Sequence, residues 1–113
     1  MTEVRHDERA CDAAITLAFS VLGKRWNGMI LGVLGGGPAS FVELRKAVTG
    51  IGDTVLSDRL TELTELGLVS RSVGAGPPLT VSYDLTAAGR EVVPTLSELG
   101  EWAKRNLPRS DSR

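Results

Sequence analysis

Residues 40–85, which read SFVELRKAVTGIGDTVLSDRLTELTELGLVSRSVGAGPPLTVSYDL, decide the fold of this chain. The stretch opens with the capping-box pattern Ser40-Phe41-Val42-Glu43, in which the hydroxyl can accept from the Glu43 amide while the carboxylate reaches back to Ser40. The pattern predicts a short helix that buries Phe41, Leu44 and Val48. Residues 49–52, TGIG, then predict a tight turn.

A second helix is predicted from Asp53 to Leu66, directly after the turn. Its apolar line stops before Gly67, a residue that suits the left-handed position after a helix. The residues of that line are Leu56, Leu60, Leu63 and Leu66. The opposite face is polar and carries Thr54, Ser57, Asp58 and Thr61. This helix is therefore expected to bury one side and expose the other.

Two strands are predicted next, over residues 68–73 and 79–85. The second strand alternates, with Val81, Tyr83 and Leu85 on one face. The connector, residues 74–78, contains glycine and proline and no charge, so it predicts a hairpin with a stiff tip. Two short helices joined by a tight turn and followed by a hairpin form a winged helix-turn-helix, which is mostly α with a small β-hairpin (α+β).

Three further helices are predicted outside this unit. Residues 12–22 are apolar on more than one face, so the helix that they form needs more than one partner. The next helix ends at the run Gly35-Gly36-Gly37-Pro38, and its apolar stripe is Trp26, Met29, Ile30, Val33 and Leu34. After the hairpin, Thr86 is expected to cap a long helix, which Pro94 should bend or locally break.

The first and last helices carry more apolar surface than one small core needs, which predicts that they form a homodimer interface. The residues expected in it are Leu17, Val21, Leu96, Leu99 and Trp102. We expect a flexible charged leader over residues 1–10 and a flexible tail over residues 108–113. Between them, residues 11–107 form the winged helix-turn-helix domain with its terminal dimerisation helices.

Composition excludes several classes of protein. The chain has 113 residues, 42% hydrophobic and 24% charged, which is typical of one globular domain. It has no apolar run that could span a bilayer and no secretory leader, so we expect a cytoplasmic protein without membrane contact. Because Cys11 is the only cysteine and His6 the only histidine, an intrachain disulfide, a metal cluster and a Cys-His hydrolase centre are all disfavoured.

Enzymatic chemistry is also disfavoured. No carboxylate pair, nucleophile–base set or glycine-rich phosphate loop stands out, and the Gly35-Gly36-Gly37 run has no lysine of the phosphate-binding kind. The sequence therefore predicts a protein that is not an enzyme and that holds no cofactor and no metal.

Motifs spread from Cys11 to Trp102 resemble the HxlR family of winged helix-turn-helix regulators, relatives of the MarR group. The first three motifs are Cys11 before the first helix, Gly23-Lys24-Arg25-Trp26, and Phe41-Val42-Glu43-Leu44-Arg45. The fourth is LSDRLTEL at residues 56–63, in the predicted second helix of the helix-turn-helix. The start and end of the wing match with Gly67-Leu68-Val69 and with YDLTAAG at residues 83–89, and the closing helix matches with Pro94, Leu96 and Trp102. The chain departs from the usual pattern at Asp12, where proline is common, at Ser40, where many members are basic, at Gly52, where serine is common, and in the uncharged wing tip.

The resemblance implies a sequence-specific regulator of transcription that binds duplex DNA as a homodimer, and it favours a repressor over an activator. The dimer would recognise a pseudo-palindrome whose half-sites lie about one helical turn apart, ~34–36 Å. A rival hypothesis is a winged helix that serves as a protein-interaction module without binding DNA. The net charge of −1 and the uncharged wing tip favour that rival. The sequence does not identify a small-molecule effector.

The docking mode of a helix-turn-helix assigns candidate DNA contacts. Its second helix lies in the major groove, so the candidates for base contact are Thr54, Ser57 and Asp58. The candidates for backbone contact are Arg45, Lys46, Arg59 and Arg71. Arg59 could instead form an ion pair with Glu62 or Glu65. Lys24 and Arg25 fit phosphate contact and a solvated surface equally well.

Cys11 has two interpretations. A free cysteine is most often a small buried hydrophobe. Cys11 also precedes a helix start, where backbone N–H groups stabilise a thiolate, and in several HxlR-type regulators the matching cysteine senses oxidants or electrophiles. The neighbouring charge of Asp12 opposes thiolate formation. A structural role and a redox-sensing role therefore both remain open.

Overall fold

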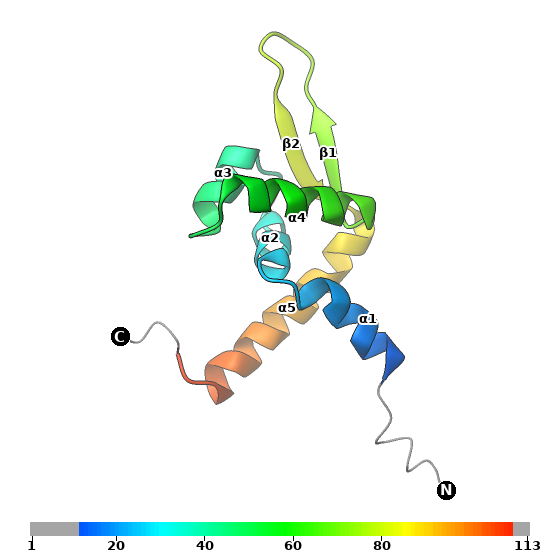
Figure 1. Cartoon of the computed structure of the whole chain (residues 1–113), viewed down its shortest axis with the longest axis vertical. Helices are drawn as coiled ribbons and strands as arrows, with labels where there is room; N and C mark the ends of the chain where they lie inside the picture. Colours follow the sequence, from blue (N-terminus) through cyan, green and yellow to red (C-terminus); the bar gives the residue numbers. More distant parts are fainter. Residues whose placement is uncertain (1–11, 110–113) are drawn as a thin grey trace, which may run out of the picture.

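The computed structural model describes residues 12–109, which form helices and a two-stranded antiparallel hairpin (Figure 1). In chain order the elements are α1 (Ala13–Leu22), α2 (Asn27–Leu34), α3 (Phe41–Ala47), α4 (Asp53–Glu65), β1 (Val69–Val73), β2 (Val81–Leu85) and α5 (Ala87–Asn106). This order confirms the predicted winged helix-turn-helix. The hairpin projects from one side of the helical body, and α1 and α5 diverge from the other.

The helix-turn-helix begins and ends where its caps predict. Ser40 Oγ accepts from the Glu43 amide at 3.1 Å, and the Ser40 amide donates to Glu43 Oε1 at 2.8 Å, which completes the capping box. After α4, Gly67 takes a left-handed φ of 80°. The amide of the next residue, Leu68, donates to the Leu63 carbonyl at 3.0 Å, so the chain turns directly into β1.

The wing is paired in register from Val69↔Leu85 to Val73↔Val81. Its base is wider than the sequence predicted, because Ala39 and Tyr83 exchange two backbone hydrogen bonds of 2.9 and 2.8 Å. This single-residue bridge ties the loop before α3 to β2. A one-residue contact has no periodicity, so no pattern in the sequence could reveal it.

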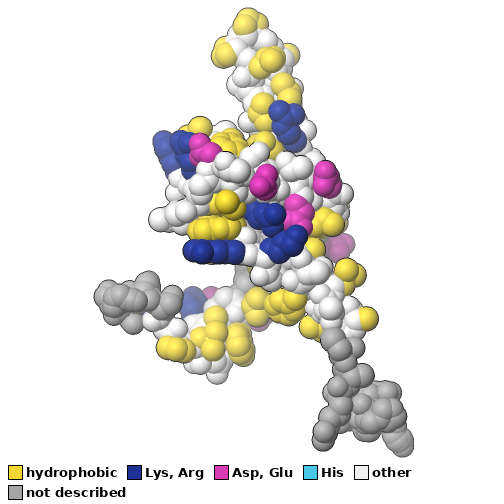
Figure 2. All heavy atoms as spheres, viewed as in Figure 1, with side chains coloured by type: hydrophobic (Ala, Val, Ile, Leu, Met, Phe, Trp, Pro, Cys, Tyr) yellow, Lys and Arg dark blue, Asp and Glu magenta, His cyan; other side chains and the backbone are white. Residues whose placement is uncertain are grey.

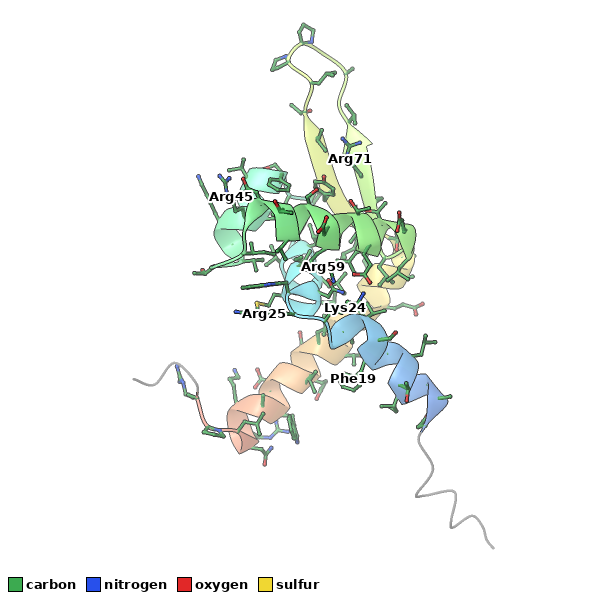
Figure 3. All side chains as sticks on the ribbon, viewed as in Figure 1. Phe19, Lys24, Arg25, Arg45, Arg59 and Arg71 are labelled. Carbon is green, nitrogen blue, oxygen red and sulfur yellow. The ribbon has the colours of Figure 1, made fainter. Side chains whose placement is uncertain are left out.

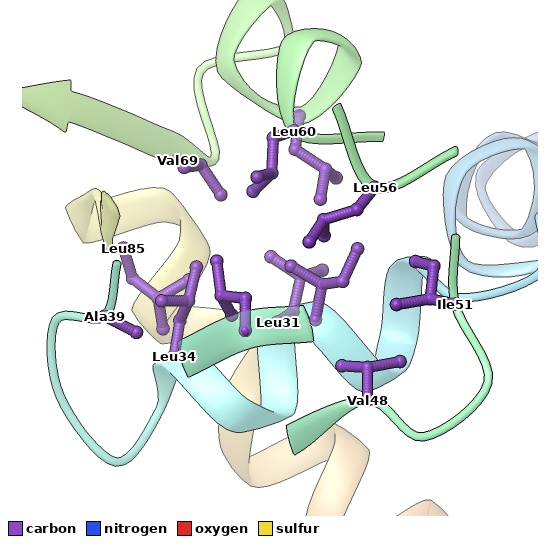
Figure 4. Close-up of a cluster of buried hydrophobic side chains, with 12 residues drawn as sticks. Leu31, Leu34, Ala39, Val48, Ile51, Leu56, Leu60, Val69 and Leu85 are labelled. Atoms are coloured by element: carbon purple, nitrogen blue, oxygen red, sulfur yellow. The ribbon is translucent and has the colours of Figure 1, made fainter. Parts of the chain in front are cut away.

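The core lies between α2, α4 and the base of the wing (Figure 4). Ile30, Leu31 and Leu34 of α2 are fully buried, together with Leu56 and Leu63 of α4. Two predicted core positions are wrong: Met29 is 53% exposed and Leu66 is 48% exposed. The reason is that α1, α3, α5 and β2 surround α2 and turn its Leu31 side inward, while α4 ends at Glu65.

The terminal helices have local start signals of their own. Asp12, which departs from the family pattern, is the N-cap of α1, and its carboxylate accepts from the Ala14 and Ile15 amides at 2.8 and 3.3 Å. Thr86 caps α5, and its hydroxyl also donates to the Gly67 carbonyl at 2.6 Å.

Pro94 does not break α5, which continues from Ala87 to Asn106. The predicted local break is therefore wrong. Val93 and Leu96, on either side of the proline, both pack against the core, and this packing supports the helix through the proline. No helix among residues 12–109 is long and apolar enough to cross a membrane.

Candidate nucleic-acid interface

The α4 helix presents the polar face that the sequence predicts. Leu56, Leu60 and Leu63 are buried, while Thr54, Ser57 and Asp58 are exposed. The three side chains cannot all share one narrow line, because Ser57 borders a groove toward the wing and Asp58 borders a groove on the other side of the helix. The exposed face of α4 therefore has two flanks with different neighbours.

The flank toward the wing is a shallow groove between α4 and the hairpin. It is lined by Ser57, Leu60, Thr61, Thr64, Glu65, Arg71 and Tyr83. Arg71 is exposed on β1, where it pairs in register with Tyr83. Two predicted sites from different elements, Ser57 and Arg71, thus come to the same groove.

The basic pair Arg45-Lys46 lies in the last turn of α3, near the start of α4. Arg45 Nη1 lies 3.2 Å from the Asp53 carboxylate, which begins α4, so one of the two charges is balanced within the chain. Lys46 is exposed in the last turn of α3. Among residues 12–109, Lys46 has no carboxylate partner, which leaves it the stronger candidate for a phosphate contact.

Arg59 forms an ion pair with Glu62, which the sequence offered as the alternative to a DNA contact. Its Nη1 lies 2.8 Å from Glu62 Oε1, without the alignment of a hydrogen bond, and Lys24 Nζ lies 2.6 Å from Oε2 of the same carboxylate. The Lys24 hydrogen bond, together with the charges of Arg59 and Lys24, lowers the pKa of Glu62, although partial burial acts in the opposite direction. A DNA contact from Arg59 remains a prediction.

The other flank of α4 brings in a segment that was not assigned to the site. Lys24, Arg25 and Trp26, in the turn between α1 and α2, line a groove with Val55, Asp58 and Arg59 of α4. Figure 3 places Lys24, Arg25 and Arg59 together beside α4, with Arg45 at the end nearest α3 and Arg71 on the wing. The sequence signals for this flank were the adjacent basic pair Lys24-Arg25 and the family-like segment Gly23-Lys24-Arg25-Trp26 that contains it.

Trp26 lies outside the helix to which its spacing assigned it. It is the N-cap of α2, with a left-handed φ of 82°. Such a conformation costs a non-glycine residue about 1–3 kcal/mol and persists only where its surroundings hold it. Here the indole packs against the core, and its far edge approaches Gly50 in the turn before α4. Asn27, the next residue, is fully buried and donates from Nδ2 to the Val21 carbonyl at 2.9 Å.

Basic side chains surround α4 on the face drawn in Figure 2, with acidic side chains among them. Cations therefore gather around α4 although the net charge of the chain is −1. In the part of the chain that the structure describes, Arg25, Lys46 and Arg71 are cations of this face without a carboxylate partner. Residues 12–109 contain no group of three or more His, Cys, Asp or Glu that could hold a metal ion.

The residues expected at the dimer interface have two kinds of environment. Leu17 of α1 is 70% exposed, and Leu99 and Trp102 of α5 are 45% and 46% exposed. Val21 and Leu96 instead pack partly against the core of their own chain. Cys11 and His6 lie outside the described residues.

Comparison with known proteins identifies close relatives. The family model described as HxlR-like helix-turn-helix matches residues 21–111. The HTH-type transcriptional regulator YodB of Bacillus subtilis is 41% identical over 86 residues, which cover 76% of this chain and 77% of YodB.

Solved structures agree with that comparison. The reduced form of YodB matches with a TM-score of 0.78 and 35% identity, over 90% of this chain and all of that one. The reduced form of the redox regulator HypR matches with a TM-score of 0.79 and 30% identity, over 83% of this chain and 93% of that one.

Proposed function

Because the chain belongs to the HxlR-like helix-turn-helix family of DNA-binding transcriptional regulators, we propose that it represses transcription as a homodimer bound to a pseudo-palindromic site. The observation that carries the proposal is the exposed polar face of α4, bordered by the wing and by cations without carboxylate partners. The proposal needs no catalytic group. It also implies that the protein works in the cytoplasm, with access to chromosomal DNA.

The proposed docking inserts α4 into the major groove. Thr54, Ser57 and Asp58 then face base edges, while Lys46 and Arg71 reach the phosphate backbone from α3 and from the wing. Arg45 and Arg59 would contribute less, because each already has a carboxylate partner, Asp53 and Glu62 respectively. In the dimer, two copies of α4 would enter successive major grooves about 34–36 Å apart.

Lys46→Ala should weaken binding to every duplex alike. Each lost phosphate contact reduces the slope of log affinity against log salt by about 0.9, which corresponds to about eightfold weaker binding per subunit at about 0.1 M salt. Fluorescence anisotropy with a labelled duplex, titrated at several salt concentrations between about 50 and 200 mM, measures both quantities.

Ser57→Ala is the matched control for Lys46→Ala. It removes a polar group from the same surface without changing the charge, so it should leave the salt slope unchanged and alter the preference among duplex sequences. A Lys46→Ala variant that changed sequence preference but kept the salt slope would contradict the phosphate assignment. If the unmodified protein bound no duplex at low salt, the protein-interaction hypothesis would replace DNA binding.

Dimerisation is proposed from the apolar surface of the terminal helices. Ile15, Leu17 and Phe19 of α1 and Leu99 and Trp102 of α5 are all exposed. Diverging helices with apolar side chains on them are expected in a subunit that a second copy completes.

A thiol response is proposed for Cys11 from the relatives. YodB has been crystallised in reduced, diamide-treated and quinone-bound forms, and HypR is described as a redox regulator with reduced and oxidised forms. Cys11 directly precedes Asp12, the N-cap of α1. A covalent change there would act next to a helix that we assign to the dimer interface, and it could therefore alter the spacing of the two α4 helices.

Diamide should change the DNA affinity of the dimer by about fivefold or more, the lower range of a typical coupling between sites. With one thiol per chain and no added thiol, the expected product is a Cys11–Cys11 disulfide between subunits, as diamide accepts two electrons and two protons. The bridge requires the two Cα atoms within about 7 Å. Non-reducing electrophoresis and anisotropy follow the bridge and the affinity.

The Cys11→Ser variant should bind DNA with the affinity of the untreated protein, and diamide should not change that affinity. The substitution retains the size of the side chain and removes the thiol. An affinity that diamide leaves unchanged in the unmodified protein, with Cys11 fully reacted, would return Cys11 to a structural role.

A further inference from the structure

The turn between α1 and α2 gives α4 a basic flank on the side away from the wing. Arg25 and Trp26 line its groove together with Val55 and Asp58, residues from the first half of α4. A major groove about 12 Å wide accommodates an α-helix of about 10–12 Å diameter, so both sides of the inserted helix face a phosphate strand. Arg71 lies on the wing side, and the turn lies on the opposite side.

Arg25 is held in place without an acidic partner. Its guanidinium carbon lies 4.4 Å from the centroid of the Trp26 ring. Within residues 12–109 no carboxylate pairs with it. Stacking orients the guanidinium plane and leaves its N–H groups available for a second ligand.

The residues around Arg25 hold the turn against α4 and leave the Arg25 charge without a carboxylate partner among residues 12–109. Lys24 and Arg59 both pair with Glu62, so this carboxylate fixes the turn to α4 across 38 residues of sequence. The left-handed Trp26 then directs the chain so that its indole reaches Gly50, in the turn between α3 and α4. The result is an aromatic support for Arg25 attached directly to the helix-turn-helix.

We propose that Arg25, stacked on Trp26, binds a backbone phosphate of duplex DNA on the flank of α4 opposite the wing. The proposal rests on the proposed function, DNA binding through α4, and adds a contact from outside the helix-turn-helix. Arginine suits the role, since its planar fork donates two hydrogen bonds to a phosphate while one face remains on the indole. The contact adds affinity and register without sequence information.

Arg25→Gln tests the proposal by removing one charge from an exposed side chain. The probe is a labelled duplex of mixed sequence, about three helical turns long, because phosphate contacts do not depend on an operator. The expected result is a salt slope reduced by about 0.9 per subunit and about eightfold weaker binding per subunit at about 0.1 M salt. Arg25→Glu should weaken binding further, while Arg25→Lys should retain most of the slope.

Arg105→Gln is the matched control, since Arg105 is an exposed cation on α5 that, among residues 12–109, also has no carboxylate partner. It should leave the slope unchanged. An Arg25→Gln slope equal to that of the unmodified protein, beside a reduced slope for Lys46→Ala, would overturn this proposal and leave DNA binding intact. A failure of the unmodified protein to bind the duplex would overturn both the Arg25 contact and the proposed DNA binding. If Arg25→Gln folds poorly, Arg25→Met, which still covers the indole, replaces it.

Discussion

Gly89→Ala should lower the free energy of unfolding by about 3 kcal/mol or more, at the upper end of the cost of overpacking a core. Gly89 is the buried residue of α5. A Cβ there would lie inside 3.0 Å of the Leu68 carbonyl oxygen and 3.1 Å from Leu85 Cδ2. The oxygen cannot move away freely, because it already accepts from the Thr86 amide at 3.0 Å. Urea unfolding followed by circular dichroism measures the loss.

Gly100→Ala is the matched control on the same helix. A Cβ at Gly100 meets nothing within 4 Å, so this substitution should be neutral or stabilise the protein by about 0.5–1 kcal/mol through helix propensity. Equal stabilities of the Gly89→Ala and Gly100→Ala variants would show that α5 can separate from the wing base without cost. The expected difference would instead show that α5 packs closely against the base of the wing at Gly89.

Trp102→Ala should raise the dissociation constant of the dimer by about a thousandfold. A large aromatic residue at the centre of an interface contributes about 2 kcal/mol or more, and a two-fold dimer contains two copies. The tryptophan is 46% exposed within one subunit, so most of the loss should fall on association and little on folding. Sedimentation equilibrium measures the constant, and DNA affinity should fall with it because half of the phosphate contacts are lost.

Leu79→Ala controls for the general effect of removing an exposed apolar side chain. Leu79 is 70% exposed in the connector between β1 and β2, and Figure 1 shows this connector far from the diverging ends of α1 and α5. This variant should dimerise like the unmodified protein. A monomeric unmodified protein at micromolar concentration, or a Trp102→Ala dimer of unchanged strength, would refute the interface.

The sequence alone was sufficient for the elements and their order. Ser40 and Gly67 mark the ends of the helix-turn-helix through hydrogen bonds to residues a few positions away, and Leu56, Leu60 and Leu63 repeat at the helical period. Such interactions are local, so the spacing of residues records them. The exposed face of α4 follows from the same periodicity, and the resemblance to the HxlR family pointed to DNA.

Only the tertiary structure decided which cations remain available for DNA. Lys24 meets Glu62 from 38 residues away, a partner that no local spacing predicts, while the adjacent Arg25 has no carboxylate partner among residues 12–109. The left-handed Trp26 and the Ala39–Tyr83 bridge are likewise consequences of packing between distant segments. Spacing along one helix was enough to suggest the Arg59–Glu62 pair, but a pair between distant elements, such as Lys24–Glu62, depends on which segments meet in space.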